Sequence, residues 1–310
     1  MKIWHHRYVL NSPWHGPDHA GSLLRVEFPG GKLGHADLHP WPELGDMDLA
    51  RLLTALASER PLPFLNRVLA IAAEDAAARA KGISLFTGHT FPSSHKLLSQ
   101  LENVSSGQLE FIAQQGYMLV KAKLGKNLAT ETATLKSLLP VSSLRWRLDF
   151  NGRLKAKEFV AWYESVRSWL KPALDGIEDP VALAEVPELT STWDPTREVS
   201  LFSDRVDHGP MSTGEVIKPE IQEFKTNKSR LWLTNNLGHP FGHGIALAYA
   251  ARWGKGESCG LQGLEDYGVG GLLTPWREQI RYHGPLTLPP SGTGFGFDHL
   301  LDRAQWKLLR

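Results

Sequence analysis

Residues 144–151 read LRWRLDFN, a run of alternating apolar and charged residues that is typical of a β-strand. Side chains two apart on a strand share a face, so Arg147, Asp149 and Asn151 point one way and the apolar residues point the other. A helical pattern follows over residues 155–170. A strand that leads into a helix in this way is the unit of a parallel α/β sheet, and we expect its charged face to line a site.

A second strand with two faces is expected over residues 117–124, where Lys121 and Lys123 share one side. In a barrel that side is the interior near the mouth, where active sites lie. Lysines on an exposed edge strand are also a common protection against edge-to-edge pairing. Taken alone, this motif favours an exposed edge strand over a site. The other predicted strands are needed to distinguish the two interpretations.

Further predicted strands also end in charged residues. The strands over 176–178, 189–193 and 215–218 end in, or are followed by, Glu178, Asp194 and Lys218. Charges placed repeatedly after apolar strand cores are costly unless they compensate one another. Five such strand ends together therefore indicate one site.

Strands and helices alternate from about residue 91, with further strands expected over 95–99, 230–234 and 260–264 and a helix over 244–253. About eight strands in roughly 200 residues predict an α/β fold of the (β/α)8 barrel type, with shortened helices between Pro180 and Gly214. The first ninety residues read as an α+β unit, with strands over 22–28 and 33–38 and helices over 46–58 and 65–81. A doubly wound open sheet is the alternative fold, but no glycine-rich phosphate loop follows the first strand.

The composition predicts no nucleic-acid or membrane partner, because 34 basic and 33 acidic residues give a net charge of +1. No segment approaches the roughly 18 uninterrupted apolar residues of a membrane span, and no apolar region follows the N-terminal charges. The one cysteine, Cys259, suits a reducing compartment. We expect a cytoplasmic protein.

The charged strand ends predict metal-assisted chemistry. Three carboxylates with no cysteine or histidine among them form an all-oxygen site suited to Mg²⁺, with Mn²⁺ as the alternative. Lysines beside such a cation have lowered pKa values, and a lysine that is neutral near pH 7 is a usable general base. A base and a metal together can remove a proton next to a carboxylate and stabilise the enediolate. The predicted ligand is a small-molecule carboxylate.

At these positions the sequence resembles the enolase superfamily, and within it the o-succinylbenzoate synthase family of menaquinone biosynthesis. The motifs that carry the resemblance are KAK at 121–123, RLDFN at 147–151, IEDP at 177–180, VIKP at 216–219, residues 234–247, and GHADLHP at 34–40. Their order and spacing are more specific than any one of them.

The resemblance implies a capping domain of residues 1–90, to which the tail 286–310 returns, over a barrel of residues 91–285. It implies Mg²⁺ held by Asp149, Glu178 and Asp194, and dehydration of 2-succinyl-6-hydroxy-2,4-cyclohexadiene-1-carboxylate to o-succinylbenzoate. The implied catalytic residues are Lys123 as the base, Lys218 opposite it on the enediolate, and Lys121 as electrostatic support. The implied substrate contacts are Arg147, Asn151, Asn235 and Asn236.

The third metal ligand stays open at this point. The interval from Glu178 to Asp194 is short for the family, and Asp194 is followed by proline. Asp204 and Asp207 are therefore alternative ligands.

Two other functions also remain open. A racemase of N-acylamino acids or an epimerase of dipeptides uses the same metal and two opposed lysines, and a non-catalytic barrel could bind a carboxylate alone. His239 and His243 are four apart, as in some zinc sites, but Pro240 and Gly242 between them argue against a regular helix there.

Overall fold

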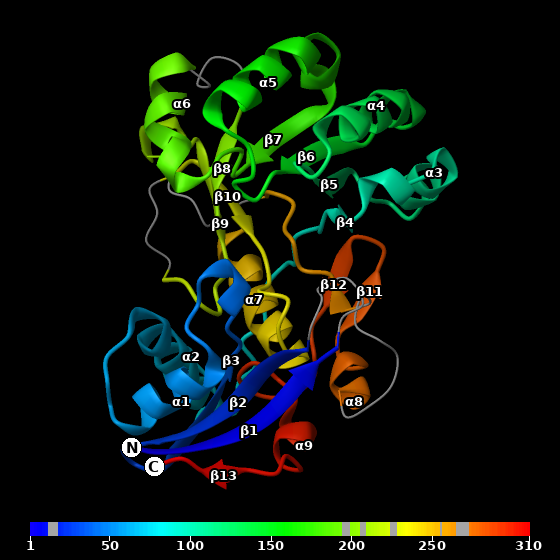
Figure 1. Ribbon diagram of the computed structural model, residues 1–310. Helices are drawn as coiled ribbons and strands as arrows, with labels where there is room; N and C mark the ends of the chain where they lie inside the picture. Colours follow the sequence, from blue (N-terminus) through cyan, green and yellow to red (C-terminus); the bar gives the residue numbers. More distant parts are fainter. Residues whose placement is uncertain (12–17, 194–198, 205–208, 224–227, 255, 265–272) are drawn as a thin grey trace.

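In the computed structural model the described residues are 1–11, 18–193, 199–204, 209–223, 228–254, 256–264 and 273–310. They form an antiparallel sheet with two helices at one end and a curled parallel sheet at the other, with helix α7 between them (Figure 1). This arrangement confirms the predicted fold class.

The antiparallel sheet has the order β13-β1-β2-β3. Its strands are β1 (Lys2–Leu10), β2 (His19–Phe28), β3 (Lys32–Leu38) and β13 (Lys307–Leu308), and its helices are α1 (Leu49–Ala57) and α2 (Pro63–Arg79). The predicted hairpin is β2–β3, whereas β1 was not predicted. Pairing of β13 with β1 brings the two chain ends side by side (Figure 1).

The parallel sheet has the order β10-β9-β8-β7-β6-β5-β4. Its strands are β4 (Lys96–Leu98), β5 (Leu119–Lys123), β6 (Arg145–Asp149), β7 (Leu174–Glu178), β8 (Leu201–Ser203), β9 (Gly214–Ile217) and β10 (Arg230–Leu233). Every neighbouring pair is parallel and follows chain order. The carboxyl ends of all seven strands therefore meet at one rim.

The outer helices are α3 (Ser106–Gln114), α4 (Leu128–Leu138), α5 (Ala156–Leu170), α6 (Val186–Thr192) and α7 (Pro240–Trp253). Short elements complete the chain: α8 (Thr274–Arg277), β11 (Arg281–His283), β12 (Leu286–Leu288) and α9 (Asp298–Leu301). Between Pro180 and Gly214 the described residues hold only the seven-residue helix α6, so the outer ring is thin there, as the sequence predicted. Among the described residues no α-helix connects β9 to β10 either, which was not predicted.

An eighth strand was predicted over residues 260–264, but the structure has no strand of that length there. The segment contributes only isolated parallel bridges, from Cys259 to Ser94 and from Gly260 to Thr234. Ser94 lies two residues before β4 and Thr234 directly follows β10, and these strands are the two edges of the sheet. Two residues are thus enough to close the curled sheet into a ring.

The strand predicted over 189–193 was also wrong, because residues 186–192 form helix α6. A proline lies in the first turn of the helix, where it is favourable. Leu189 is the one buried residue of α6. The strand at this place in the sheet is β8, which was not predicted because it is only three residues long.

Helix α7 begins at Pro240, which corrects the sequence argument against a helix at this point. Proline is tolerated in a first turn, since its missing N–H needs no partner there. Gly242 lets the helix approach Asp37 of β3: a Cβ at Gly242 would lie 2.6 Å from Asp37 Oδ2. His239 caps the helix and donates its amide to the same carboxylate at 3.1 Å. Asp37 therefore joins the antiparallel sheet to the barrel.

This buried carboxyl group predicts a dependence of stability on pH. Burial raises the pKa of Asp37 from 3.8 to about 7, against hydrogen bonds from Tyr8 and His239 that lower it. Between about pH 4 and 7 the folded chain binds a proton that the unfolded chain has lost, so stability falls as pH rises through this window. From pH 5 to pH 8 the wild type should lose about 2–3 kcal/mol more unfolding free energy than Asp37→Asn.

The comparison between the two proteins isolates Asp37, because both keep His39, whose pKa burial lowers to about 3 and whose effect on stability has the opposite sign. Urea unfolding of both proteins at the two pH values is the measurement. Equal pH dependence in wild type and Asp37→Asn would show that Asp37 is ionised in the folded protein at pH 5.

Candidate active site

Strand register places three predicted site residues at one level of the barrel. Lys123 of β5 lies beside Asp149 of β6, and Asp149 lies beside Glu178 of β7. Each ends its strand at the rim, and both carboxylates are buried. The level below holds Lys121 beside Arg147. The alternation of the sequence therefore directs all five side chains toward the barrel interior.

The two lysines of β5 have different partners. Lys121 Nζ lies 2.6 Å from Glu178 Oε2 and 3.0 Å from Asp149 Oδ2. Burial by itself lowers the pKa of Lys121, but the carboxylates of Asp149 and Glu178 outweigh it and raise that pKa above its ordinary value. The prediction of a lowered lysine pKa is thus wrong for Lys121, which stays a cation.

The side-chain amine of Lys123 forms no hydrogen bond or salt bridge with any residue in the described part of the chain. Burial lowers the pKa of Lys123, and the ammonium groups of Lys121 and Lys218 lower it further against the attraction of Asp149. The predicted lowered pKa is confirmed here. Lys123 is the one of the three site lysines that combines a lowered pKa with an unpaired amine.

Asp204 lies at the site next to Lys218. It follows β8, two residues after the buried Phe202, and its carboxylate forms a salt bridge with Lys218 Nζ. Its amide donates to Asp179 Oδ1 at 3.1 Å, which ties the end of β8 to the end of β7. Asp194 and Asp207 lie outside the described residues. The strand on which the Asp194 assignment depended is helix α6.

These side chains line a cavity of about 280 Å³ at the barrel mouth. The loop after β3 covers it with Trp41, Glu43 and Leu44. Trp41 Nε1 donates to the carbonyl of Asn236 at 2.8 Å, and Asn236 Nδ2 donates to the carbonyl of His39 at 2.8 Å. The antiparallel domain is therefore fastened directly to the rim of the barrel.

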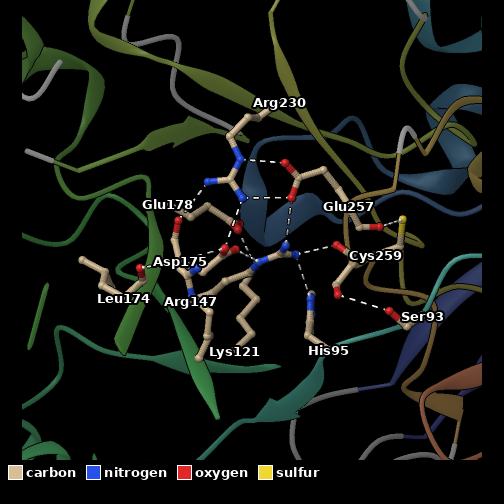
Figure 2. Close-up of polar contacts among 12 residues, drawn as sticks. Ser93, His95, Lys121, Arg147, Leu174, Asp175, Glu178, Arg230, Glu257 and Cys259 are labelled. Carbon is tan, nitrogen blue, oxygen red and sulfur yellow. Dashed lines mark hydrogen bonds and ion pairs between the residues drawn. The ribbon is translucent and has the colours of Figure 1, made fainter. Parts of the chain in front are cut away.

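Arg147 does not line this cavity, which corrects its assignment as a substrate contact. It lies at the floor with 1% exposure, where Nε bonds to Asp175 at 2.8 Å and Nη1 bonds to the Ser258 carbonyl at 2.7 Å (Figure 2). Its guanidinium stacks 3.8 Å from the ring centre of Trp232. Lys121 lies at the same level but extends to Asp149 and Glu178, whereas the bonds to Asp175 and Ser258 hold the Arg147 guanidinium away from the mouth.

The three predicted asparagines all line the cavity, in different ways. Asn151 has a left-handed backbone (φ 49°) at the turn after β6. Asn235 donates to the Gln262 carbonyl and accepts from the Leu237 amide, so its side chain stabilises the rim. Asn236 Nδ2 donates to the His39 carbonyl, while its buried Oδ1 has no hydrogen-bond partner among the described residues. Substrate contact by these residues stays a prediction.

Sequence reasoning missed several residues of the cavity wall. They include His95, Thr234, Gln262 and Arg153, and the covering residues Trp41, Glu43 and Leu44. His95 precedes β4 and packs against Arg147, and burial with Arg147 lowers its pKa well below 6.5, so the ring is neutral. No alternating pattern marks His95, because β4 reads KLL and His95 precedes it. Nothing in the sequence marks the covering loop.

The donor set fits a divalent cation. Burial raises the pKa of Glu178 to about 8, and the neighbouring carboxylates of Asp149 and Asp204 add to this. The carboxylates of Asp149, Glu178 and Asp204 all line this cavity, and three oxygen donors of this kind suit Mg²⁺. In the described part of the chain no three such groups already converge on one point, and the ammonium of Lys121 lies between two of the carboxylates.

Comparison with known proteins gives two sequence matches. Residues 3–78 match the family model of the N-terminal domain of O-succinylbenzoate synthase. The chain is 28% identical to o-succinylbenzoate synthase of Bdellovibrio bacteriovorus, over 97% of this chain and 94% of that protein.

Solved structures show the same fold at low identity. N-succinyl Arg/Lys racemase of Bacillus cereus superposes with a TM-score of 0.73 and 14% identity, over 100% of both chains. A dipeptide epimerase of Cytophaga hutchinsonii, in a complex with Mg and the dipeptide D-Ala-L-Val, gives a TM-score of 0.76 and 10% identity, over 100% of this chain and 99% of that one.

A curled parallel barrel under an antiparallel capping sheet carries lysines and carboxylates at its rim. Together with this fold, the sequence matches support membership of the o-succinylbenzoate synthase family of the enolase superfamily. These matches also support the prediction that the protein is an enzyme. Within the described residues, no helix has the length and apolar character needed to cross a membrane.

Proposed function

We propose that this protein dehydrates 2-succinyl-6-hydroxy-2,4-cyclohexadiene-1-carboxylate to o-succinylbenzoate in the cytoplasm, as a lyase of menaquinone biosynthesis. The observation that supports it most directly is the contrast between the unpaired amine of Lys123, whose pKa is lowered, and the amine of Lys218, which pairs with Asp204. One unpaired base and one amine fixed by a carboxylate suit a reaction that removes a proton on one face and stabilises negative charge from the other.

In this reaction Lys123 takes the proton from the ring carbon next to the carboxylate. The carbon–oxygen bond at the neighbouring ring carbon then breaks, and the hydroxyl group leaves as water with the proton that Lys123 returns. The ring becomes aromatic, so no oxidant is needed. Lys218 faces the negative charge of the enediolate, and Lys121 holds Asp149 and Glu178 in place.

The proposed metal ligands are Asp149, Glu178 and Asp204, with Asp194 as the ligand expected from sequence. When bound, Mg²⁺ supplies positive charge that lowers the cost of forming a doubly negative enediolate. We expect chelation by EDTA to reduce turnover to background, and added Mg²⁺ or Mn²⁺ to restore it. Full activity after exhaustive chelation and verified metal removal would contradict a metal-dependent reaction.

The direct test of function is incubation of the purified protein and Mg²⁺ with the cyclohexadiene substrate. We expect the ultraviolet absorbance of an aromatic product to rise. Without that product, exchange of the α-proton of N-succinylamino acids in deuterated water would favour the racemase alternative. Neither reaction, with Mg²⁺ still bound in calorimetry, would favour a carboxylate-binding barrel.

A further inference from the structure

The turn that follows β9 carries Lys218 and is fixed at its own backbone. The Lys218 carbonyl accepts from the amides of Ile221 and Gln222 at 3.0 and 2.9 Å, and the Lys218 amide donates to Gln222 Oε1 at 2.7 Å. Pro219 has no N–H, so only its carbonyl is available for a bond outside the turn. The position of Lys218 therefore depends on what holds this short turn against the rest of the molecule.

Arg67 of α2 reaches that carbonyl from the capping domain. Arg67 Nε donates to the Pro219 carbonyl at 2.7 Å, and the residue is only 8% exposed. Its guanidinium stacks on Tyr249 of α7, with Cζ 4.7 Å from the ring centre. The bond thus crosses from a capping helix to the residue directly after Lys218.

Burying the charged guanidinium of Arg67 costs free energy that an apolar side chain at this position would not cost. In the described part of the chain it has no salt bridge, and its Nη2 has no hydrogen-bond partner. A buried cation without an ion pair loses its hydration with little compensation. A methionine of similar volume would fill the same space at lower cost. Besides its contacts with Tyr249, the guanidinium adds the bond to the Pro219 carbonyl, which methionine could not form.

Glu220 extends the connection to the next strand end. It is buried, and its Oε1 accepts from the Asn236 amide at 2.9 Å. Asn236 is itself bonded to His39 and Trp41 of the capping domain. The ends of β9 and β10 are thus linked to each other and to the capping domain. The linking residues Glu220 and Asn236 are separate from the proposed metal ligands.

From this geometry we infer that Arg67 is a positioning residue for Lys218, which makes correct seating of the capping domain a condition for placing the second lysine. The inference rests on the proposed role of Lys218 in the reaction. A displacement of about 1 Å in a catalytic group can reduce turnover about 100-fold. Loss of the Arg67 bond should therefore affect kcat more than KM.

Arg67→Met is the test, with Arg252→Met as its matched control. Arg252 stacks on the same Tyr249 ring, also with Cζ at 4.7 Å, and pairs with Glu74, but has no bond to the Lys218 turn. In Arg67→Met we expect amide hydrogen exchange of residues 217–222 to quicken at least about tenfold. We expect kcat to fall about 10- to 100-fold with KM within about threefold. Arg252→Met should change neither property.

Arg67→Lys adds a milder variant, which keeps one donor and should recover a large part of kcat. Hydrogen exchange in α5, far from the contact, reports whether each variant is folded. Exchange of 217–222 equal to wild type in Arg67→Met, or equal kcat losses in Arg67→Met and Arg252→Met, would overturn the inference. Exchange needs no substrate, so the result stands even if the wild type fails to dehydrate the proposed compound.

Discussion

Lys123→Met is expected to reduce turnover about 10²- to 10⁴-fold, the usual contribution of a general base. Methionine keeps the length of the side chain but has no amine to accept the α-proton. Because the amine of Lys123 has no hydrogen-bond or ion-pair partner among the described residues and burial lowers its pKa, the substitution removes a polar group that nothing compensates. The thermal midpoint should therefore stay equal or rise, and Mg²⁺ affinity should not fall.

The measurements are steady-state turnover, thermal unfolding and calorimetric titration with Mg²⁺ on the same preparations. Lys126→Ala is the control, since Lys126 is an exposed lysine three residues further along the chain. It should retain wild-type turnover. If Lys123→Met keeps more than about a tenth of wild-type turnover, Lys123 does not act as a general base.

Asp204→Asn is expected to weaken Mg²⁺ binding by about 100-fold or more, and to reduce turnover in proportion at limiting metal. The change keeps the shape of the side chain but removes one of three negative charges from an all-oxygen site. It also removes the ion-pair partner of Lys218. Calorimetric titration with Mg²⁺ measures the first effect directly.

Asp194→Asn and Asp207→Asn serve as the matched comparisons, because each was an alternative third ligand. We expect both to bind Mg²⁺ within about threefold of wild type. The opposite pattern, with Asp194→Asn weak and Asp204→Asn normal, would return the third ligand to Asp194. Asp204 would then remain only as the partner of Lys218.

The sequence by itself determined the fold class and most of the site. Alternation in residues 117–124 and 144–151 requires charged and apolar side chains on opposite faces, whatever the sheet around them. Lys121, Lys123, Asp149 and Glu178 accordingly lie together at one rim. Parallel strands bring their carboxyl ends to the same edge, so local pattern and topology were enough.

Tertiary structure decided what depends on distances across the barrel. Residues 186–192 form a helix with Leu189 as its one buried residue, and the three-residue β8 pairs with β7 and β9. The depth of a side chain inside the barrel cannot be read from the sequence either. Arg147 and Asp149 share a face of β6 but lie at different levels of the barrel. Ion pairing shifted the pKa values of Lys121 and Lys123 in opposite directions, because the pKa of a buried lysine depends on which carboxylates surround it. The capping-domain contacts of Arg67, His39 and Trp41 join residues more than 150 positions apart, and no local pattern encodes them.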